Sequence, residues 1–305
     1  MGLPDFFVIG VPKAGTTALH AALARHPDLF MSRVKEPKFF LTDGPPPTRG
    51  GGPGDAQTYR EHVWRRADYE ALFHAAPAGR LRGESTPFYL HDSEAQRRIQ
   101  RLVPESRLIA VLRDPVERAH SNWTHLWSAG LEPIGDPVAA CAAEPERIAS
   151  GWAAFWRYVE LGRYGEQLKR LYELFPREQV LVLHYRELRF EAAATLDRIC
   201  GFLGVRTGLI DTVPRENVTT HVADSRGARM LQRVLRGGAI FGRYAPASVR
   251  EVIRRPFLAA LQRDRRPRQP LTWTERERLI PYFADDIALL QEITGYDYSA
   301  WLKPA

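Results

Sequence analysis

The 305-residue sequence has few cysteines, few lysines and no long apolar run. Its two cysteines, Cys141 and Cys200, match neither a metal-binding nor a redox spacing, so we expect buried thiols. No apolar run approaches the roughly eighteen residues that a membrane-spanning helix needs. The first residues show no charged leader followed by an apolar signal segment, which predicts a cytoplasmic protein without membrane contact.

The distribution of lysine, arginine and histidine argues against nucleic-acid binding and against a metal site. Arginine supplies nearly all the positive charge behind the net charge of +7. The charges are spread along the chain without an aromatic-interleaved stripe or a recognition-helix pattern, so nucleic-acid binding is not expected. The excess positive charge is instead explained by a basic cleft that binds an anionic cofactor. The histidines form no H-x-x-x-H pair on a predicted helix, and no metal site is expected.

A phosphate-binding loop is the most informative feature of the chain. The β-leaning run Phe6–Val11 leads through Gly10, Lys13 and Gly15 to Thr16, which opens an alanine- and leucine-rich helix. Glycines let backbone amides approach an anion, and the helix N-terminus adds partial positive charge. Gly10 and Gly15 have the separation of a nucleoside-triphosphate loop, but Thr16 occupies the lysine position of that motif. Alone, the pattern also fits an ordinary strand–turn–helix with a surface lysine.

A second anion site is predicted near residue 113. The apolar run Leu108–Leu112 predicts a buried strand that ends at Arg113, because Pro115 cannot continue the pairing. Residues 116–128 predict a helix that carries Ser121. A guanidinium can hold a phosphate with two hydrogen bonds, and a hydroxyl adds a third. Taken alone, Arg113 would more often be a structural residue paired with a neighbouring carboxylate.

The strand–helix alternation continues with Val180–His184 and a helix near 191–203, and it predicts the fold class. We expect an α/β protein with a P-loop-like parallel sheet, helices on both faces, and ligands at the C-terminal ends of the strands. The chain 1–305 is expected to form a single domain, in which the arginine-rich residues 206–270 form a helical cap. Residues 43–55 are expected to form a mobile loop. A helix is expected at 145–172, and another at 274–290.

Both anion loops resemble those of sulfotransferases that use 3′-phosphoadenosine 5′-phosphosulfate (PAPS). G-x-x-K-x-G-T-T is similar to the 5′-phosphosulfate loop of that family, and L-R-D-P-V-E-R-A-H-S is similar to its 3′-phosphate site. The resemblance is greatest to the Golgi-type and bacterial carbohydrate or natural-product enzymes, which include the heparan sulfate sulfotransferases. It covers residues 6 to about 205 and about 270 to 302, with further similar phrases at 26–28, 35–40, 83–89, 162–164, 175–183 and 295–301.

The resemblance implies an enzyme that transfers the sulfuryl group from PAPS to a hydroxyl of a small-molecule or carbohydrate acceptor, a bacterial natural product. The products include adenosine 3′,5′-bisphosphate, and no metal is implied. Glu36 matches the family's catalytic base, and Lys13 would stabilise the departing 5′-phosphate oxygen. The residues implied to hold the cofactor are Pro12, Lys13, Ala14, Gly15, Thr16, Thr17, Ala18, Arg113 and Ser121.

The chain also departs from the family pattern. Ser85 stands where the glycosaminoglycan enzymes carry a lysine, and Gln167 stands where some of them carry a histidine. The C-terminal cysteine-bridged loop of those enzymes is missing, and the candidates to replace its cofactor contact are Arg265, Arg266 and Arg268. These departures favour a small acceptor over a long polyanionic sugar.

Several roles stay open at the level of sequence. Glu36 is either the base or an ion-pair partner of Lys35 or Lys38, and Glu84 is either a second acid or base, or a partner of Lys13 or an arginine. Three histidines are either reserve bases or ordinary surface and core residues: His91, His120 and His125. Three aromatic residues either line the acceptor pocket or belong to the core: Trp152, Trp156 and Tyr164.

Two other functions use the same loop shape. The first is a nucleoside or small-molecule kinase, but the lysine after Gly15 is missing and no clear strand-end aspartate is available for magnesium. The second is a catalytically inactive nucleotide-binding module. The combined presence of Lys13, Glu36, Arg113 and Ser121 argues against this second function.

Overall fold

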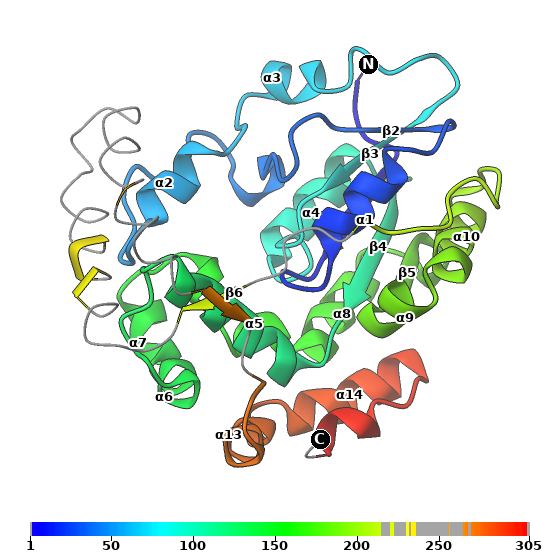
Figure 1. Cartoon of the computed structure of the whole chain (residues 1–305). Coiled ribbons are helices and arrows are strands. Elements are labelled where there is room, and N and C mark those ends of the chain that lie inside the picture. Colours follow the sequence, from blue (N-terminus) through cyan, green and yellow to red (C-terminus); the bar gives the residue numbers. More distant parts are fainter. Residues whose placement is uncertain are drawn as a thin grey trace.

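A five-stranded parallel sheet forms the core of the protein (Figure 1). The computed structural model describes residues 2–214, 220–222, 230–231, 233–235, 256, 265–267 and 270–303. The strand order is β2-β3-β1-β4-β5, and all neighbouring strands are parallel. The strands are β1 (Phe6–Gly10), β2 (Leu29–Met31), β3 (Leu81–Ser85), β4 (Arg107–Leu112) and β5 (Val180–His184). The predicted α/β fold class is confirmed.

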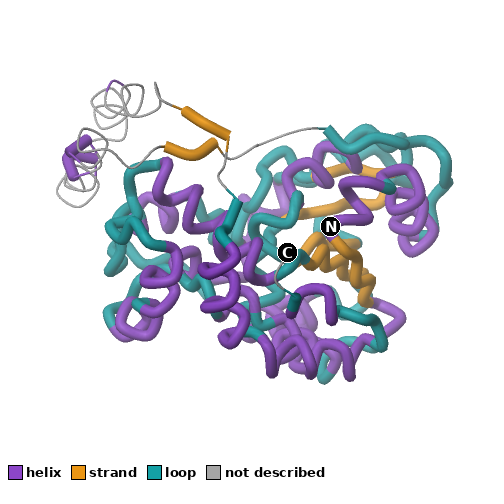
Figure 2. The backbone as a smooth tube through the Cα atoms, turned by 60° about the horizontal axis from the view of Figure 1, so that its bottom comes forward, coloured by secondary structure: helices purple, strands orange, loops and turns teal. Residues whose placement is uncertain are grey.

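Helices lie on both faces of this sheet (Figures 1 and 2). The chain passes in one direction across the sheet from β1 to β2 and in the other direction from β3 to β4. Because parallel crossovers are right-handed, the two connecting helices lie on opposite faces. The helices that matter for the site are α1 (Thr16–Leu23), α4 (Ser93–Leu102), α5 (Pro115–Ser128), α8 (Tyr164–Tyr172), α9 (Tyr185–Phe190) and α10 (Ala192–Leu203).

The central strands β1 and β4 are apolar, apart from Arg107 at the start of β4, as expected for strands that helices cover on both faces. Every residue of β1 is buried, and β4 is buried from Leu108 to its end. The register pairs Val8 with Ser85 and Leu112 with His184, so the C-terminal ends of the strands meet at one edge of the sheet. The loop after β1 and the turn after β4 both leave from this edge, as predicted.

The segment 145–172 is not the continuous helix that its sequence predicts. Helix α7 (Glu144–Ala149) is followed by two 3₁₀ turns, Ala154–Trp156 and Glu160–Gly162, before α8 begins. Gly151, at φ 70°, follows the end of α7. Beyond it, carboxylates of other segments accept backbone amides that would otherwise extend a helix: Asp55 accepts from Ala153, and Glu144 accepts from Val159 and Glu160.

The predicted helix at 274–290 is also interrupted. Helix α13 (Trp273–Leu279) is separated from α14 (Ala284–Thr294) by the 3₁₀ turn Ile280–Tyr282. The break falls at Pro281, which has no amide hydrogen to continue an α-helix.

Residues 206–270, expected to form a helical cap, lie largely outside the described residues. Within the described part, β6 (Thr220–Val222) and β7 (Arg265–Pro267) pair in antiparallel fashion, so this segment is not helical throughout. Strand β6 lies against α5. The side chains proposed to contact the cofactor from this segment, Arg265, Arg266 and Arg268, lie outside what the structure describes.

The glycine-rich loop 43–55 is anchored at its C-terminal end. Asp55, the first residue of α2 (Asp55–Arg60), is 2% exposed and accepts the amides of Gly52 at 2.7 Å and Ala153 at 2.9 Å. The indole N–H of Trp156 donates to the same carboxylate at 2.8 Å. This end of the loop therefore docks onto the segment that follows α7.

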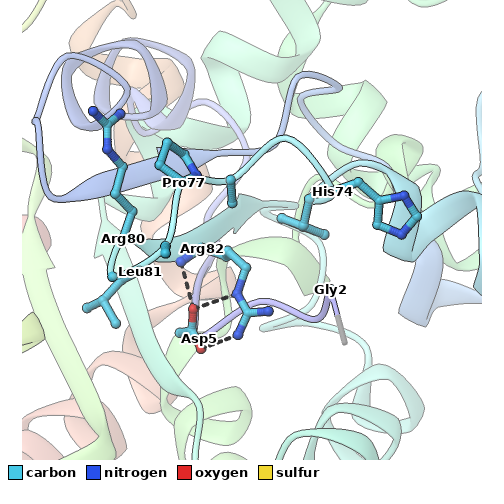
Figure 3. A pocket seen from close by; sticks show the side chains of 11 residues that line it. Gly2, Asp5, His74, Pro77, Arg80, Leu81 and Arg82 are labelled. Atoms are coloured by element: carbon cyan, nitrogen blue, oxygen red, sulfur yellow. Dashed lines mark hydrogen bonds and ion pairs between the residues drawn. The ribbon is translucent and has the colours of Figure 1, made fainter.

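The opposite edge of the sheet carries a depression of about 500 Å³ (Figure 3). It lies where β1 and β3 begin and includes Gly2, His74 and Arg80 among its lining residues. The Arg82 guanidinium and the Asp5 carboxylate pair there at 2.8 Å. None of the candidate site residues lines this depression. Within the described residues, no helix is long and apolar enough to cross a membrane.

Candidate functional site

The loop between β1 and α1 has the backbone geometry of an anion cradle. Gly15 is the N-cap of α1 at φ 80°, and no side chain caps the helix. The first amides of α1, beginning at Thr16, have no carbonyl partners within the helix and are available to an anion. A Cβ at Gly15 would lie 3.1 Å from the Tyr185 ring, so position and backbone angle both require glycine. Residues 12–18, predicted to bind the 5′-phosphate, span this loop and the first residues of α1.

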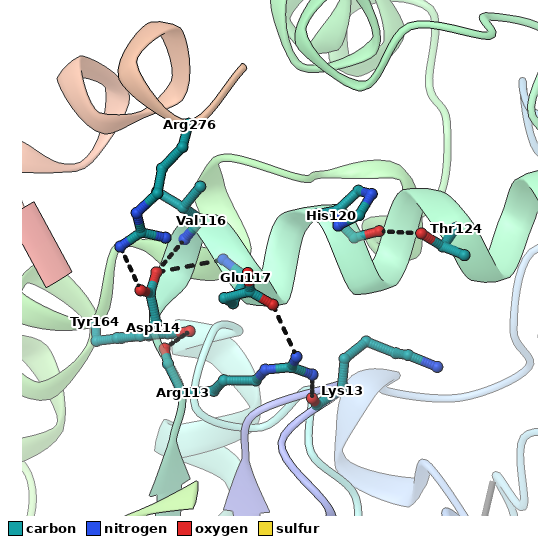
Figure 4. Close-up of polar contacts among 9 residues, drawn as sticks. All are labelled: Lys13, Arg113, Asp114, Val116, Glu117, His120, Thr124, Tyr164 and Arg276. Carbon is teal, nitrogen blue, oxygen red and sulfur yellow. Dashed lines mark hydrogen bonds and ion pairs between the residues drawn. The ribbon is translucent and has the colours of Figure 1, made fainter. Parts of the chain in front are cut away.

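Arg113 joins the two predicted anion loops. Its Nη1 donates to the Lys13 carbonyl oxygen at 2.9 Å, across 100 residues of sequence (Figure 4). Its Nη2 donates to Glu117 at 3.3 Å, and its guanidinium lies 5.0 Å from the centre of the Tyr185 ring. The structural partner considered from the sequence is therefore present, and the same side chain also touches the phosphate loop. Ser121 lies on α5 and is buried.

The backbone at Arg113 is held from a third element. The Tyr164 hydroxyl, at the start of α8, donates to the Arg113 carbonyl oxygen at 2.9 Å (Figure 4). The next residue, Asp114, accepts the amides of Val116 at 2.9 Å and Glu117 at 3.2 Å and so caps α5. The turn after β4 is thus fixed by hydrogen bonds to its side chains and to its backbone.

The predicted base Glu36 lies in a loop attached to the end of β3. Its amide donates to the Ser85 carbonyl oxygen at 3.0 Å, and its carboxylate pairs with Lys35. The other partner considered, Lys38, pairs with Glu61 at 3.0 Å. The loop that carries Glu36 follows β2, and the hydrogen bond from the Glu36 amide ties it to the end of β3, the strand that pairs with β1, from which the Lys13 loop leaves.

Backbone strain is concentrated at these two loops. Among the described residues, the non-glycine residues with left-handed φ are Lys13 at 70°, Glu36 at 59° and Lys38 at 61°. Such conformations cost about 1–3 kcal/mol each and persist where the surrounding structure enforces them, often at functional sites. Two of the three are the residues predicted to be catalytic.

Glu84 is buried beneath the site and does not line an accessible surface. It is 0% exposed, and its carboxylate accepts hydrogen bonds from the hydroxyls of Tyr69 and of Thr86, the latter at 2.6 Å. Burial raises the pKa of Glu84 to about 7, although these hydrogen bonds and one from Tyr89 oppose the shift. The charge of nearby Glu36 raises it further.

His20 is a site residue that the sequence reasoning missed. Its Nδ1 lies 3.0 Å from the Ser85 hydroxyl, at the position of the family departure noted above. Burial, together with the positive charge of Lys35, lowers the pKa of His20 to about 4, so the ring is neutral at pH 7. Its position four residues after Thr16 places it on the same face of α1, which is the signal that could have identified it.

The three reserve histidines occupy different environments. His125 is open to solvent on one side but crowded by protein on the others, which lowers its pKa to about 4 with help from the Lys13 charge. Its ring meets Phe155 edge to face at 5.6 Å. His120 is buried and stacks on Trp123 at 5.7 Å. Burial and neighbouring arginines lower the pKa of His91 to about 3.

The aromatic residues proposed for the acceptor pocket pack mainly into the core. Trp156 and Tyr164 are buried, and Trp152 is half-buried with its ring 4.8 Å from that of Trp156. Phe155, half-buried with ring contacts to His125 at 5.6 Å and Phe88 at 5.9 Å, was not predicted.

Metal ligands do not converge in the described part of the chain. Within those residues, no group of three or more His, Cys, Asp or Glu side chains is arranged to hold an ion.

Comparisons with known proteins show which family this chain resembles. The model of the Sulfotransferase family matches residues 4–208. The human heparan sulfate glucosamine 3-O-sulfotransferase 3B1 is 31% identical over 253 residues, which are 83% of this chain and 59% of the relative. The human bifunctional heparan sulfate N-deacetylase/N-sulfotransferase 3 is 30% identical over 214 residues, 67% of this chain and 22% of the relative.

A solved structure resembles nearly the whole chain. The crystal structure of a sulfotransferase from Alicyclobacillus acidocaldarius superimposes with a TM-score of 0.76 and 27% identity, and the match covers 99% of this chain and 100% of that one. The chain thus spans three-fifths or less of these two curated relatives but the full length of the bacterial structure.

Proposed function

This chain belongs to the sulfotransferase family, and we propose that it transfers the sulfuryl group of PAPS to a hydroxyl of a small-molecule or carbohydrate acceptor. The observation that carries the proposal is the hydrogen bond between Arg113 and the Lys13 carbonyl oxygen. It brings a strand-end guanidinium against a phosphate loop, so that one nucleotide with phosphates at both ends can reach both.

The donor groups present fit such a nucleotide. The uncapped N-terminus of α1 offers amides for the 5′ end. A guanidinium has five N–H donors, and the two hydrogen bonds described for Arg113 use two of them, which leaves donors for a 3′-phosphate. Ser121 lies on the helix that begins two residues after Arg113. We infer that Arg113 and Ser121 bind the 3′-phosphate and that residues 12–18 bind the 5′-phosphate.

The proposed chemistry needs a base and a positive charge. PAPS supplies the sulfuryl group and leaves as adenosine 3′,5′-bisphosphate. Glu36 accepts the proton of the acceptor hydroxyl, and Lys13 offsets the negative charge that develops on the departing 5′-phosphate oxygen. The strained backbone at both residues supports these roles, because such strain is retained where it aims a side chain. The transferred group carries a single charge, so positioning and electrostatics suffice without a metal.

The acceptor in this proposal is a small hydroxylated molecule. The Lys13 charge acts on the ring of His125, which is neutral at pH 7 and meets the half-buried ring of Phe155 edge to face. Flat rings of this kind suit a phenol or the apolar face of a sugar. Ser85, where a lysine would serve a polyanionic chain, is fully buried and hydrogen-bonded to His20. A bacterial natural product fits these side chains better than heparan sulfate, on which the relatives are named to act.

The test combines a conservative change at Glu36 with a matched change at its partner. With PAPS and a panel of phenols and sugars, mass spectrometry reports the gain of one sulfuryl group. Glu36→Gln should lower turnover by roughly 10²–10⁴-fold, the usual contribution of a positioned base, because an amide cannot accept the proton. Its affinity for adenosine 3′,5′-bisphosphate, measured by calorimetry, should stay near that of the wild type.

Lys35→Gln is the control, since it breaks the same ion pair but leaves the carboxylate in place. If Glu36 serves only that ion pair, both variants should lose little activity, and the loss of stability should be similar and about 1 kcal/mol or less. Turnover of Glu36→Gln within a few-fold of wild type would remove Glu36 from the mechanism.

A further inference from the structure

The C-terminal segment reaches the predicted nucleotide site through one buried arginine. Arg276, on α13, is 5% exposed, and its Nη2 lies 2.6 Å from the Asp114 carboxylate, 162 residues earlier in the chain (Figure 4). The same guanidinium donates to the backbone carbonyl oxygens of Trp301 and Lys303, both at 2.9 Å. Arg276 therefore ties the end of the chain to the turn after β4, although it lies outside the residues matched by the family model.

Asp114 divides its two carboxylate oxygens between two tasks. Oδ1 accepts the amides of Val116 and Glu117 and caps α5, the helix that carries Ser121. Oδ2 accepts from Arg276. A carboxylate held at both oxygens cannot rotate, so the backbone that presents Arg113 is fixed from the α13 side as well as from Tyr164.

The contact between Arg276 and Asp114 also neutralises the carboxylate next to Arg113. Asp114 directly follows Arg113, and an uncompensated carboxylate beside that guanidinium would repel an incoming phosphate dianion. Arg276 supplies a full positive charge within hydrogen-bond distance of the carboxylate, and the N-terminus of α5 adds partial positive charge. The Arg276 charge is itself enclosed, so it is little screened by solvent.

We propose that Arg276 is a positioning residue for recognition of the nucleotide 3′-phosphate: it orients and neutralises Asp114, and thereby keeps Arg113 available to that phosphate. This proposal rests on the proposed function, because it assumes that Arg113 binds the 3′-phosphate. It adds the C-terminal segment to the nucleotide-binding machinery without requiring any residue of that segment to touch the nucleotide.

The test compares two nucleotides that differ only in the 3′-phosphate. Calorimetry gives the affinities for adenosine 3′,5′-bisphosphate and for adenosine 5′-monophosphate, and their ratio is the 3′-phosphate preference. Arg276→Met should reduce this preference by about tenfold, as expected for directly coupled neighbours, while affinity for the monophosphate changes little. A change that only loosened the fold would weaken both nucleotides alike.

Matched variants distinguish the effect of Arg276 on Asp114 from a general disturbance of the C-terminal segment. Asp114→Asn combined with Arg276→Met keeps a capping side chain and removes the uncompensated charge, so it should recover most of the preference. Arg177→Met is the control: Arg177 donates to the Ile293 carbonyl oxygen in α14 at 2.7 Å, so its loss disturbs the same segment without reaching Asp114. Its preference should equal that of wild type.

The outcomes are decisive in each case. An unchanged preference in Arg276→Met overturns the proposal, as does an equal loss in Arg177→Met. If Arg276→Met does not fold, Arg276→Gln decides: glutamine can still donate a hydrogen bond but carries no charge to neutralise Asp114, so an unchanged preference there also overturns the proposal. Arg113→Ala tests the premise separately. If Arg113→Ala keeps the full preference, the proposed 3′-phosphate site itself is wrong, whatever Arg276 does.

Discussion

The buried carboxyl of Glu84 should make the stability of this protein fall as the pH rises. Its pKa is about 7 in the folded protein, against 4.5 for an ordinary glutamate. Between these two values the folded state holds a proton that the unfolded state has released. The free energy of unfolding therefore decreases with rising pH in this window. At 1.36 kcal/mol per pKa unit, the full effect is about 3 kcal/mol, present below pH 4.5 and lost above pH 7.

Glu84→Gln isolates this contribution, because glutamine resembles the protonated carboxyl and does not titrate. Urea unfolding of both proteins should be measured at pH values from 4.5 to 8. Subtracting one free energy from the other cancels the titration of all other groups that the change leaves unperturbed. The difference should shift in favour of the variant by about 3 kcal/mol across the range. Parallel stability curves would show that Glu84 does not hold a proton in the folded state, and would refute the reasoning.

Two further predictions concern packing and chemistry. Gly51→Ala should destabilise the fold by about 1–3 kcal/mol in thermal unfolding, because its Cβ would lie 2.2 Å from the Ser150 carbonyl oxygen. In the same assay, Gly201→Ala in α10 should stabilise the fold by about 0.5–1 kcal/mol, because no atom lies within 4 Å of the new Cβ. If Gly51→Ala is as stable as Gly201→Ala, the docking of the glycine-rich loop is not as described. Sulfuryl transfer should survive EDTA, since the proposed roles use only Lys13, Glu36 and the phosphate-binding residues; activity lost to the chelator and restored by magnesium would contradict that mechanism.

Three of the five strands, β1, β4 and β5, and the places of the two predicted anion loops at their ends could be predicted because their signals are local. Strands such as Val180–His184 are short apolar runs bounded by polar residues, and the structure reproduces this strand at the predicted bounds. Gly15 is the left-handed N-cap of α1, a conformation that glycine adopts more readily than other residues. Pro115 is the first residue of α5, a position that proline favours. Each of these features depends on residues within a few positions of one another.

The error in the segment 145–172 has the opposite origin, since it depends on a partner far along the chain, whereas the break at Pro281 within 274–290 is a local signal that the sequence reasoning missed. The segment after α7 has enough helix-forming residues to predict a helix, but Asp55, almost a hundred residues earlier, takes the Ala153 amide and ends that possibility. Hydrogen bonds of this kind leave no periodic trace in the sequence of either segment.

The same distance dependence explains why the site was only partly predicted. The sequence identified Arg113 but offered two readings of it, a phosphate ligand or a structural ion-pair partner, as if they excluded each other. In the structure Arg113 pairs with Glu117 and also reaches the Lys13 carbonyl oxygen, so the structural contacts are what hold the guanidinium at the phosphate loop. Tyr164 was identified only as a candidate for the acceptor pocket, and Arg276 carries no motif; that they fix this turn from 51 and 162 residues away is recognised only once the fold brings them together. Candidates for a phosphate-binding arginine are therefore better sought among arginines whose structural partners converge on a strand end than among arginines that lack partners.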